Sequence, residues 1–333
     1  MNALVPKPRP MFLPNTGRRL GAGGHFPVPA VIADAGEHAA RRFLEFFAAT
    51  IRNRNTRMAY YRAVCTFFSW LEQNQIGLVE VEPVHVAAYV ERLLTTAAKP
   101  TVKQHLAAIR HLFDWLVVGQ VLAVNPAHAV RGPKHVIRRG KTPVLTEDQA
   151  RRLLESIDIS TLVGLRDRAL IGVMVYTFAR VSAVAAMTVD DYYPQGKRWW
   201  LRLHEKGGKR HEMPAHHKLE AFLDEYLTAA CIRDAGKTPL FRSAAGKTGR
   251  LTDRPMHRID VYEMVRRRTA AAGFKVKLGC HVFRATGITA YLEAGGTLEN
   301  AQAMAAHESP RTTKLYDRTG DEITLDEVER ITI

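Results

Sequence analysis

Cysteine is scarce in this chain of 333 residues: only Cys65, Cys231 and Cys280 occur, and they lie far apart. An odd number of widely spaced cysteines provides neither a disulfide framework nor the paired spacing of a zinc site. We therefore expect these thiols to be small buried groups in a protein that stays in a reducing compartment.

Long apolar runs are also missing. The longest, from Leu170 to Ala179, is too short to span a bilayer. The start of the chain lacks the apolar core of a secretory signal. These two absences predict a soluble intracellular protein and argue against a membrane-spanning one.

Motifs for nucleotide and metal chemistry are incomplete. The triplets at 236–238 and 246–248 read Gly-Lys-Thr, but neither has the earlier glycine that a phosphate-binding loop requires. The 14 histidines lack the spacing and the carboxylate support of metal ligands. The sequence thus predicts no metal site and no cofactor.

Basic residues, by contrast, are abundant. The chain has 48 Lys and Arg against 33 Asp and Glu, a formal net charge of +15. Such an excess favours a polyanionic partner, because each phosphate that a cation neutralises releases condensed counterions. Charge alone does not separate DNA from RNA or from an acidic membrane, but nucleic acid is the first expectation.

The length of the chain suits two domains. Residues 1–36 carry six prolines and a glycine cluster, which predicts a mobile tail. Residues 37–128 repeat apolar side chains at helical spacing and predict a small all-helical domain. Its helices are expected at 37–49, 57–73, 83–95 and from Thr101, where Thr101 to Gln104 form a capping box.

A basic linker follows at residues 129–145. Its run from Arg131 to Lys141 has no apolar period and is densely charged. Such a run is usually solvated, but it can equally lie along phosphates, and both descriptions can hold together.

The second predicted domain covers residues 146–333 and opens with a capping box at Thr146 to Gln149. A β-hairpin is expected from residues 198–204 and 210–213, because Gly207-Gly208 separates two strand-like runs. From about 318 the chain is expected to form a C-terminal tail. The predicted helices are 147–156, 162–177, 216–231, 258–272, 281–293, 297–306 and 310–317.

Four segments of this domain carry candidate chemistry. Arg180 ends a long apolar run, so it either terminates a helix or faces a cleft. Lys206 lies on the hairpin turn, where a lysine is usually solvated but can also reach into a groove. His281 and Arg284 share one helical face, where both can hold one anion.

The fourth segment runs from His307 to Tyr316. Ser309 can cap a helix that begins at Pro310 and carries Tyr316 on its second turn. A tyrosine on a short helix is most often a packing residue, so its meaning depends on the other three segments.

In this order and spacing, the four segments resemble the tyrosine recombinase (phage integrase) family: Arg, Lys on a hairpin, His-x-x-Arg, then His and a Tyr nine residues later. The resemblance covers residues 146–320 and extends less specifically to residues 55–60 and 101–115. It implies a mainly α fold with a small antiparallel β-sheet. It also implies a two-domain DNA clamp, formed by a helical core-binding domain and a mixed α/β catalytic domain.

The resemblance also implies a role for each residue. Tyr316 would be the nucleophile that forms a 3′-phosphotyrosine, Lys206 the general acid, and His281 a base and phosphate ligand. The remaining implied phosphate ligands are Arg180, Arg284 and His307. One departure is Ala183, which occupies the position where the family often has an acidic residue that supports the first arginine.

These residue types suit phosphodiester chemistry. Arginines are permanently charged, planar donors that match phosphate oxygens. A cationic pocket helps a phenol of ordinary pKa about 10 to ionise. A phosphotyrosine ester conserves the bond energy, so rejoining requires neither ATP nor metal.

The implied partners are double-stranded DNA and further copies of the chain: a dimer on each site and a tetramer in the synapse, with a Holliday junction intermediate. An accessory DNA-bending protein is a candidate partner, no membrane is expected, and the implied location is the nucleoid in a bacterial cytoplasm. The C-terminal tail would pack on a neighbouring subunit or fray. Candidate DNA contacts are the basic residues Arg57, Lys103, Arg110, Lys134, Arg138, Arg139, Lys141 and Lys209.

Two alternatives stay open from the sequence. A type IB topoisomerase would use the same chemistry to relax supercoils without strand exchange. A DNA-binding accessory protein could keep the fold without catalysis. Neither the target sequence nor the outcome, whether integration, excision, inversion or resolution, is indicated.

Overall fold

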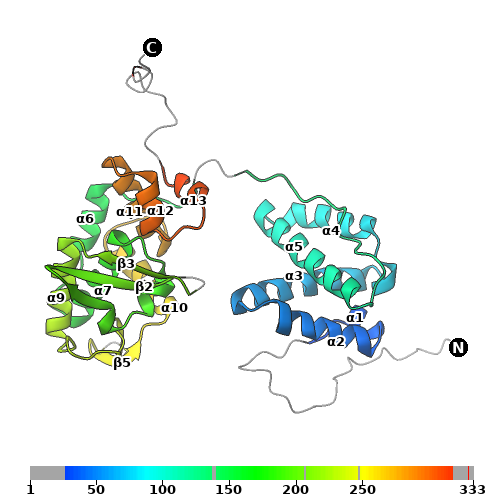
Figure 1. The fold of residues 1–333 in the computed structure, drawn as a ribbon, viewed down its shortest axis with the longest axis horizontal. Helices are drawn as coiled ribbons and strands as arrows, with labels where there is room; N and C mark the ends of the chain where they lie inside the picture. Colours follow the sequence, from blue (N-terminus) through cyan, green and yellow to red (C-terminus); the bar gives the residue numbers. More distant parts are fainter. Residues whose placement is uncertain (1–26, 137–139, 206–207, 247, 318–328, 330–333) are drawn as a thin grey trace. The chain divides into compact units, whose positions relative to one another are not determined.

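The computed structural model describes residues 27–136, 140–205, 208–246, 248–317 and 329. The chain divides into two compact units, Met1–Val136 and Ile137–Ile333 (Figure 1). Lys206, Arg138, Arg139 and nearly all of the C-terminal tail lie outside the described residues.

The first unit is helical. Its longest helices, α3 and α5, pack against each other, and α5 also contacts α2 and α4. The core is rich in phenylalanine, which buries a large apolar area per residue. The elements are α1 (Ala30–Asp34), α2 (Glu37–Glu45), the π-helix η1 (Phe46–Thr50), α3 (Arg54–Gln73), the 3₁₀-helix η2 (Leu78–Glu80), α4 (Pro83–Thr96) and α5 (Lys99–Val118).

Two predictions for this unit are wrong in part. The segment predicted as a tail contains helix α1, because Val31 and Ile32 are buried in the core of the unit. Helix α5 begins at Lys99 rather than at Thr101, and its N-cap Ala98 has no side-chain cap. Pro100 sits in its first turn, where a missing N–H costs nothing, so no capping box is used.

The second unit combines helices with two small antiparallel sheets. The sheet β1-β2-β3 has β2 at its centre, and Leu201 and Leu203 on β2 are buried at alternate positions. The predicted hairpin is confirmed as β2 and β3, whereas β1, β4 and β5 were not predicted. The helices are α6 (Glu147–Glu155), α7 (Leu162–Tyr176), α8 (Val181–Ala185), the 3₁₀-helix η3 (Val189–Asp191), α9 (His217–Ala229), α10 (Arg258–Ala271), α11 (His281–Glu293), α12 (Leu298–Met304) and α13 (Pro310–Lys314). The strands are β1 (Tyr192–Gln195), β2 (Arg198–His204), β3 (Arg210–Pro214), β4 (Arg242–Ala244) and β5 (Leu251–Pro255).

Helix α7 is the central element of the second unit and contacts α8, α9 and α11. Its approach to α11 is close at Gly287, where a Cβ would lie 2.1 Å from the carbonyl oxygen of Val175. Glycine at this position therefore lets the helix that begins at His281 lie directly against the end of α7.

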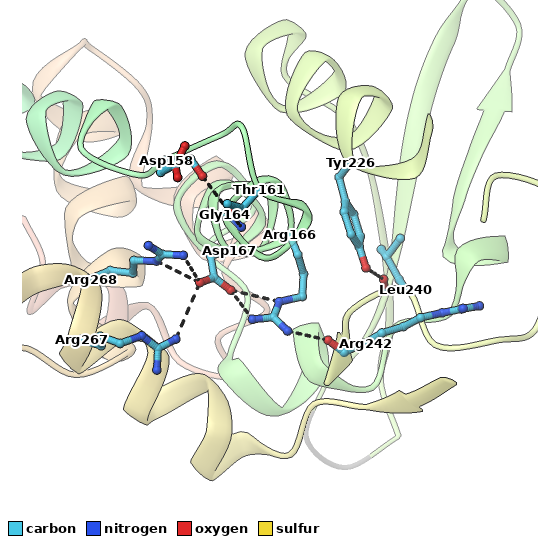
Figure 2. A network of polar contacts seen from close by, with 10 residues as sticks. All are labelled: Asp158, Thr161, Gly164, Arg166, Asp167, Tyr226, Leu240, Arg242, Arg267 and Arg268. Atoms are coloured by element: carbon cyan, nitrogen blue, oxygen red, sulfur yellow. Dashed lines mark hydrogen bonds and ion pairs between the residues drawn. The ribbon is translucent and has the colours of Figure 1, made fainter. Parts of the chain in front are cut away.

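A buried carboxylate joins α7 to its neighbours (Figure 2). Asp167 is fully buried and accepts from Arg166 at 2.6 Å and from Arg268 of α10 at 2.9 Å. Arg166 donates in turn to the carbonyl of Arg242 on β4 at 2.8 Å. The network thus ties α7, α10 and β4 together in the interior.

Three expectations about the whole chain can be compared with the structure. Among the described helices, none is both long and apolar enough to cross a membrane. No cluster of metal-ligating side chains occurs within the described residues. Cys65 and Cys280 are partly buried, but Cys231, two residues after α9, is exposed, so its predicted burial is wrong.

Candidate active site

Five of the six candidate catalytic residues lie in described parts of the second unit, and Lys206 does not. They come from three places in the chain: the turn between α7 and α8, the first turn of α11, and the segment around α13. The structure brings these three segments together: Arg284 contacts Phe178, 106 positions earlier, and His281 contacts Tyr316, 35 positions later.

Tyr316 lies directly after α13, not on its second turn as predicted, because the helix ends at Lys314. Its start does follow the prediction, with Ser309 as N-cap and Pro310 in the first turn. The hydroxyl of Thr289 on α11 donates to the backbone carbonyl of Tyr316 at 2.9 Å. The side chain is buried at 8% exposure, so the tyrosine is held within its own domain.

Two histidines flank the phenol ring. Nε2 of His281 lies 2.7 Å from the hydroxyl oxygen of Tyr316, which is hydrogen-bond distance. The ring of His307 stacks on the tyrosine ring with centroids 5.8 Å apart and planes at 10°. Nδ1 of His307 lies 2.8 Å from the hydroxyl of Thr313, which fixes the orientation of the imidazole.

Arg284 is almost completely buried, at 1% exposure. Its guanidinium donates to the backbone carbonyls of Phe178 and Ala305, and its Nε has no partner among the described residues. Phe178 has a φ of 56°, in the left-handed region that non-glycine residues rarely occupy. In this conformation the carbonyl of Phe178 accepts from Arg284. Arg180 follows two residues later in the chain.

Arg180 is the N-cap residue of α8 and its side chain is 33% exposed. Its Nη1 lies 2.6 Å from Oε2 of Glu205, the last residue before the hairpin turn. Glu205 is a residue of the candidate site that the sequence motifs do not indicate. An acidic residue next to Lys206, in a chain that has Ala183 in place of the usual acid, was the available indication.

Burial and nearby positive charge together shift the pKa values of the side chains in this site. Burial, with Arg284 and Arg180 nearby, lowers the pKa of His307 to about 3 and also lowers the pKa of His281. Burial raises the pKa of Tyr316, although both arginines act in the opposite direction. Burial and Arg180 lower the pKa of Arg284 to about 10. Without DNA, these shifts favour the protonated phenol of Tyr316 and the neutral imidazoles of His281 and His307.

This electrostatic arrangement suits an anion. The guanidinium groups of buried Arg284 and part-exposed Arg180 are close enough to interact, and Glu205 is the carboxylate paired with Arg180. A phosphate that enters would compensate the remaining charge and accept from donors already in place.

The candidate DNA contacts differ in what their side chains do. Lys103, Lys134 and Lys141 are exposed, and Lys209 lies 3.6 Å from Glu308. Arg57 donates to the carbonyl of Ile51 at 2.9 Å. Arg110 donates to the carbonyls of Ala127 and Val130, so its guanidinium is used to hold the segment after α5.

Comparisons with known proteins agree on one family. The Phage integrase family matches residues 143–322, and the N-terminal SAM-like domain of phage integrases matches residues 40–119. The tyrosine recombinase XerC of Thermodesulfovibrio yellowstonii is 28% identical over 269 residues, which covers 79% of this chain and 85% of the relative.

Solved structures share the fold. The XerH site-specific recombinase in a post-cleavage complex with palindromic difH substrate has a TM-score of 0.67 at 17% identity, covering 88% of this chain and 93% of that chain. A lambda integrase tetramer bound to a Holliday junction has a TM-score of 0.66 at 17% identity, covering 91% of this chain and 85% of that chain. These similarities confirm the predicted mainly α fold with small antiparallel sheets. With more than half of its length matched by the family, the chain belongs to the phage integrase family.

Proposed function

We propose that this protein is a site-specific tyrosine recombinase that cuts and rejoins double-stranded DNA through Tyr316. The observation that carries the proposal is the contact between the Tyr316 hydroxyl and His281, beside the buried Arg284. A nucleophile, a base and a cationic phosphate ligand thus meet in one pocket.

In the proposed reaction, Arg180 and Arg284 hold the non-bridging oxygens of the scissile phosphate. The neutral imidazole of His281 takes the phenolic proton as the Tyr316 oxygen attacks phosphorus. The bond from phosphorus to the 5′ oxygen breaks, and this oxygen takes a proton from Lys206. The tyrosine is then linked to the 3′ phosphate.

Rejoining reverses these steps. A 5′ hydroxyl from the partner duplex attacks the phosphotyrosine and gives its proton to Lys206, while protonated His281 returns its proton to the departing Tyr316 oxygen. Because one phosphodiester is exchanged for another, no ATP or metal is consumed. His307, which stacks on Tyr316, would donate a hydrogen bond to the phosphate.

We also propose domain boundaries and an oligomeric assembly from the family to which the chain belongs. Residues 37–128 would form the core-binding domain, 129–145 the basic linker and 146–333 the catalytic domain. A dimer would occupy each site and a tetramer the synapse, on DNA in the nucleoid of a bacterial cytoplasm. The tetramer of lambda integrase on a Holliday junction supports this arrangement.

Tyr316→Phe tests the nucleophile. We expect this change to abolish covalent protein–DNA adducts while DNA affinity stays within about 0.5 kcal/mol, because only the hydroxyl is removed. Adducts are measured on denaturing gels after trapping, and the trapped DNA is sequenced to map the cleavage site. Tyr291→Phe is the matched control, since Tyr291 lies in the same apolar cluster and should leave adducts unchanged. Adducts that persist in Tyr316→Phe would refute the assignment.

Strand exchange is separated from topoisomerase activity on a supercoiled plasmid that carries two mapped sites. Recombination changes the connectivity of the restriction fragments, whereas relaxation alone does not. Relaxation without rearranged fragments would favour the topoisomerase alternative. Specific DNA binding without any adduct in the natural sequence would favour the accessory protein.

A further inference from the structure

We propose that Glu205 is the positioning residue for Arg180 and replaces, from the hairpin, the carboxylate that position 183 lacks. This inference rests on the proposed function, since it concerns how Arg180 is presented to a scissile phosphate.

The contacts between the two residues fix both the backbone and the side chain of Arg180. Oε2 of Glu205 lies 2.6 Å from Nη1 of Arg180. Oε1 of the same carboxylate accepts from the backbone N–H of Arg180 at 3.3 Å. One carboxylate thus holds the start of α8 and the guanidinium that extends from it.

The carboxylate is also shielded from water. Most surface ion pairs contribute little because solvent screens them. The side chain of Glu205 is only 3% exposed, so its ion pair with Arg180 is screened less. Within the described residues, Glu205 is the carboxylate that forms an ion pair with Arg180. Ala183 is itself buried and offers no charge.

Glu205 further relieves repulsion inside the pocket. Arg180 lowers the pKa of Arg284, and Glu205 acts in the opposite direction on the same group. Without the carboxylate, two guanidinium groups would face each other until phosphate arrived. Arg180 would then be expected to turn outward to solvent, away from the phosphate position.

The same residue connects Arg180 to the hairpin. The backbone N–H of Glu205 donates to the carbonyl of Lys209 at 2.8 Å, which links the end of β2 to the residue before β3. On the preceding side, His204 lies 3.5 Å from Asp191. The carboxylate is therefore held by a fixed strand end and is not a freely rotating surface group.

Glu205→Gln tests the proposal, because it keeps the shape and removes the charge. The probe is a nicked suicide duplex built on the mapped cleavage site, and the readout is the single-turnover rate of adduct formation. We expect a loss of about 10²-fold, the size typical of one misplaced transition-state donor. Glu212→Gln is the matched control, since Glu212 pairs with Arg202 at 2.7 Å in the same hairpin but is 44% exposed. The control rate should stay within about twofold.

Double variants show whether Glu205 acts through Arg180. In an Arg180→Ala background, Glu205→Gln should cost less than about twofold, because the group it positions is gone. In a Lys206→Ala background the full loss should remain. A methylphosphonate at the scissile position, which is uncharged, should also shrink the defect of Glu205→Gln. A merely structural role would give the same loss in all these settings.

The outcomes are distinguishable from failure of the proposed function. No adduct in the natural sequence would overturn recombinase activity itself. Normal adducts in the natural sequence together with an unchanged rate in Glu205→Gln would overturn only the positioning role. The same holds if Glu205→Gln causes its full loss of rate in the Arg180→Ala background. If Glu205→Gln does not fold in a thermal melt, Glu205→Asp keeps the charge and shortens the reach. A rate for folded Glu205→Asp between those of the natural sequence and Arg180→Ala supports the proposal, and a rate below Arg180→Ala contradicts it.

Discussion

His307 is a neutral imidazole held in a cationic pocket, and this has a consequence for stability. Burial and the nearby arginines lower its pKa to about 3 in the folded chain, while an unfolded histidine titrates near its ordinary value. Between pH of about 6.5 and 3 the unfolded chain therefore binds more protons than the folded chain. Stability is fully present above this window and is lost as the pH falls through it.

We expect His307→Gln to flatten the dependence of the free energy of unfolding on pH between pH 5 and 7. One such histidine contributes a slope of at most about 1.4 kcal/mol per pH unit. Urea titrations at several pH values measure the slope. An unchanged slope in His307→Gln would contradict the assignment of a buried neutral imidazole.

The sequence indicates the members of the candidate site better than it indicates the tertiary contacts that position their side chains. The family resemblance, based on order and spacing, singled out Tyr316, His281 and Arg284, and the structure places the three side chains next to one another. It could not identify Glu205, because that residue meets Arg180 only through a tertiary contact across 25 positions. Nor could it show that burial outweighs the arginines in the pKa of Tyr316.

Asp167 belongs to the network that joins α7, α10 and β4, so we expect it to stabilise the packing of these elements. The carboxylate is fully buried and offsets Arg166 and Arg268, which are themselves largely buried. Removing one partner of a buried ion pair leaves the other charge without compensation, at a cost of about 3–5 kcal/mol. We expect Asp167→Asn to lower the free energy of unfolding by that amount in urea titrations.

Arg267 supplies the control for this network. Its guanidinium lies 3.9 Å from Asp167 and its side chain is 61% exposed, so solvent screens the interaction. Arg267→Gln should change stability by no more than about 0.5 kcal/mol. If both variants had equal effects, the stabilisation would come from the surface charge of α10 and not from the buried carboxylate.

Elements with a strong local pattern were predicted from the sequence, and elements that depend on partners were not. The capping box at Thr146 is present as predicted, and β2 and β3 pair as the predicted antiparallel hairpin. Strands β4 and β5 were missed because their short segments carry no alternation and pair only with each other. Helix α1 forms because Val31 and Ile32 pack into the core of the first unit, which a count of prolines cannot reveal.

For the whole molecule, the excess of positive charge predicts binding to DNA that weakens steeply with salt. The net charge of +15 does not say which cations touch phosphate, but side-chain geometry separates them. Lys134 is exposed on the segment that leaves the first unit. Arg110 on α5 instead donates to the carbonyls of Ala127 and Val130, and these hydrogen bonds hold the start of that segment against α5.

These two residues therefore give opposite results in one pair of experiments. If Lys134 contacts a phosphate, Lys134→Gln reduces the slope of log affinity against log salt by about 0.9 and leaves stability unchanged. Arg110→Gln removes two hydrogen bonds to backbone carbonyls and should lower the free energy of unfolding by about 1–3 kcal/mol. Its salt slope should stay as in the natural sequence. Fluorescence anisotropy across a salt series and urea titration measure the two quantities, and an unaltered slope in Lys134→Gln would remove this lysine from the DNA-contacting surface.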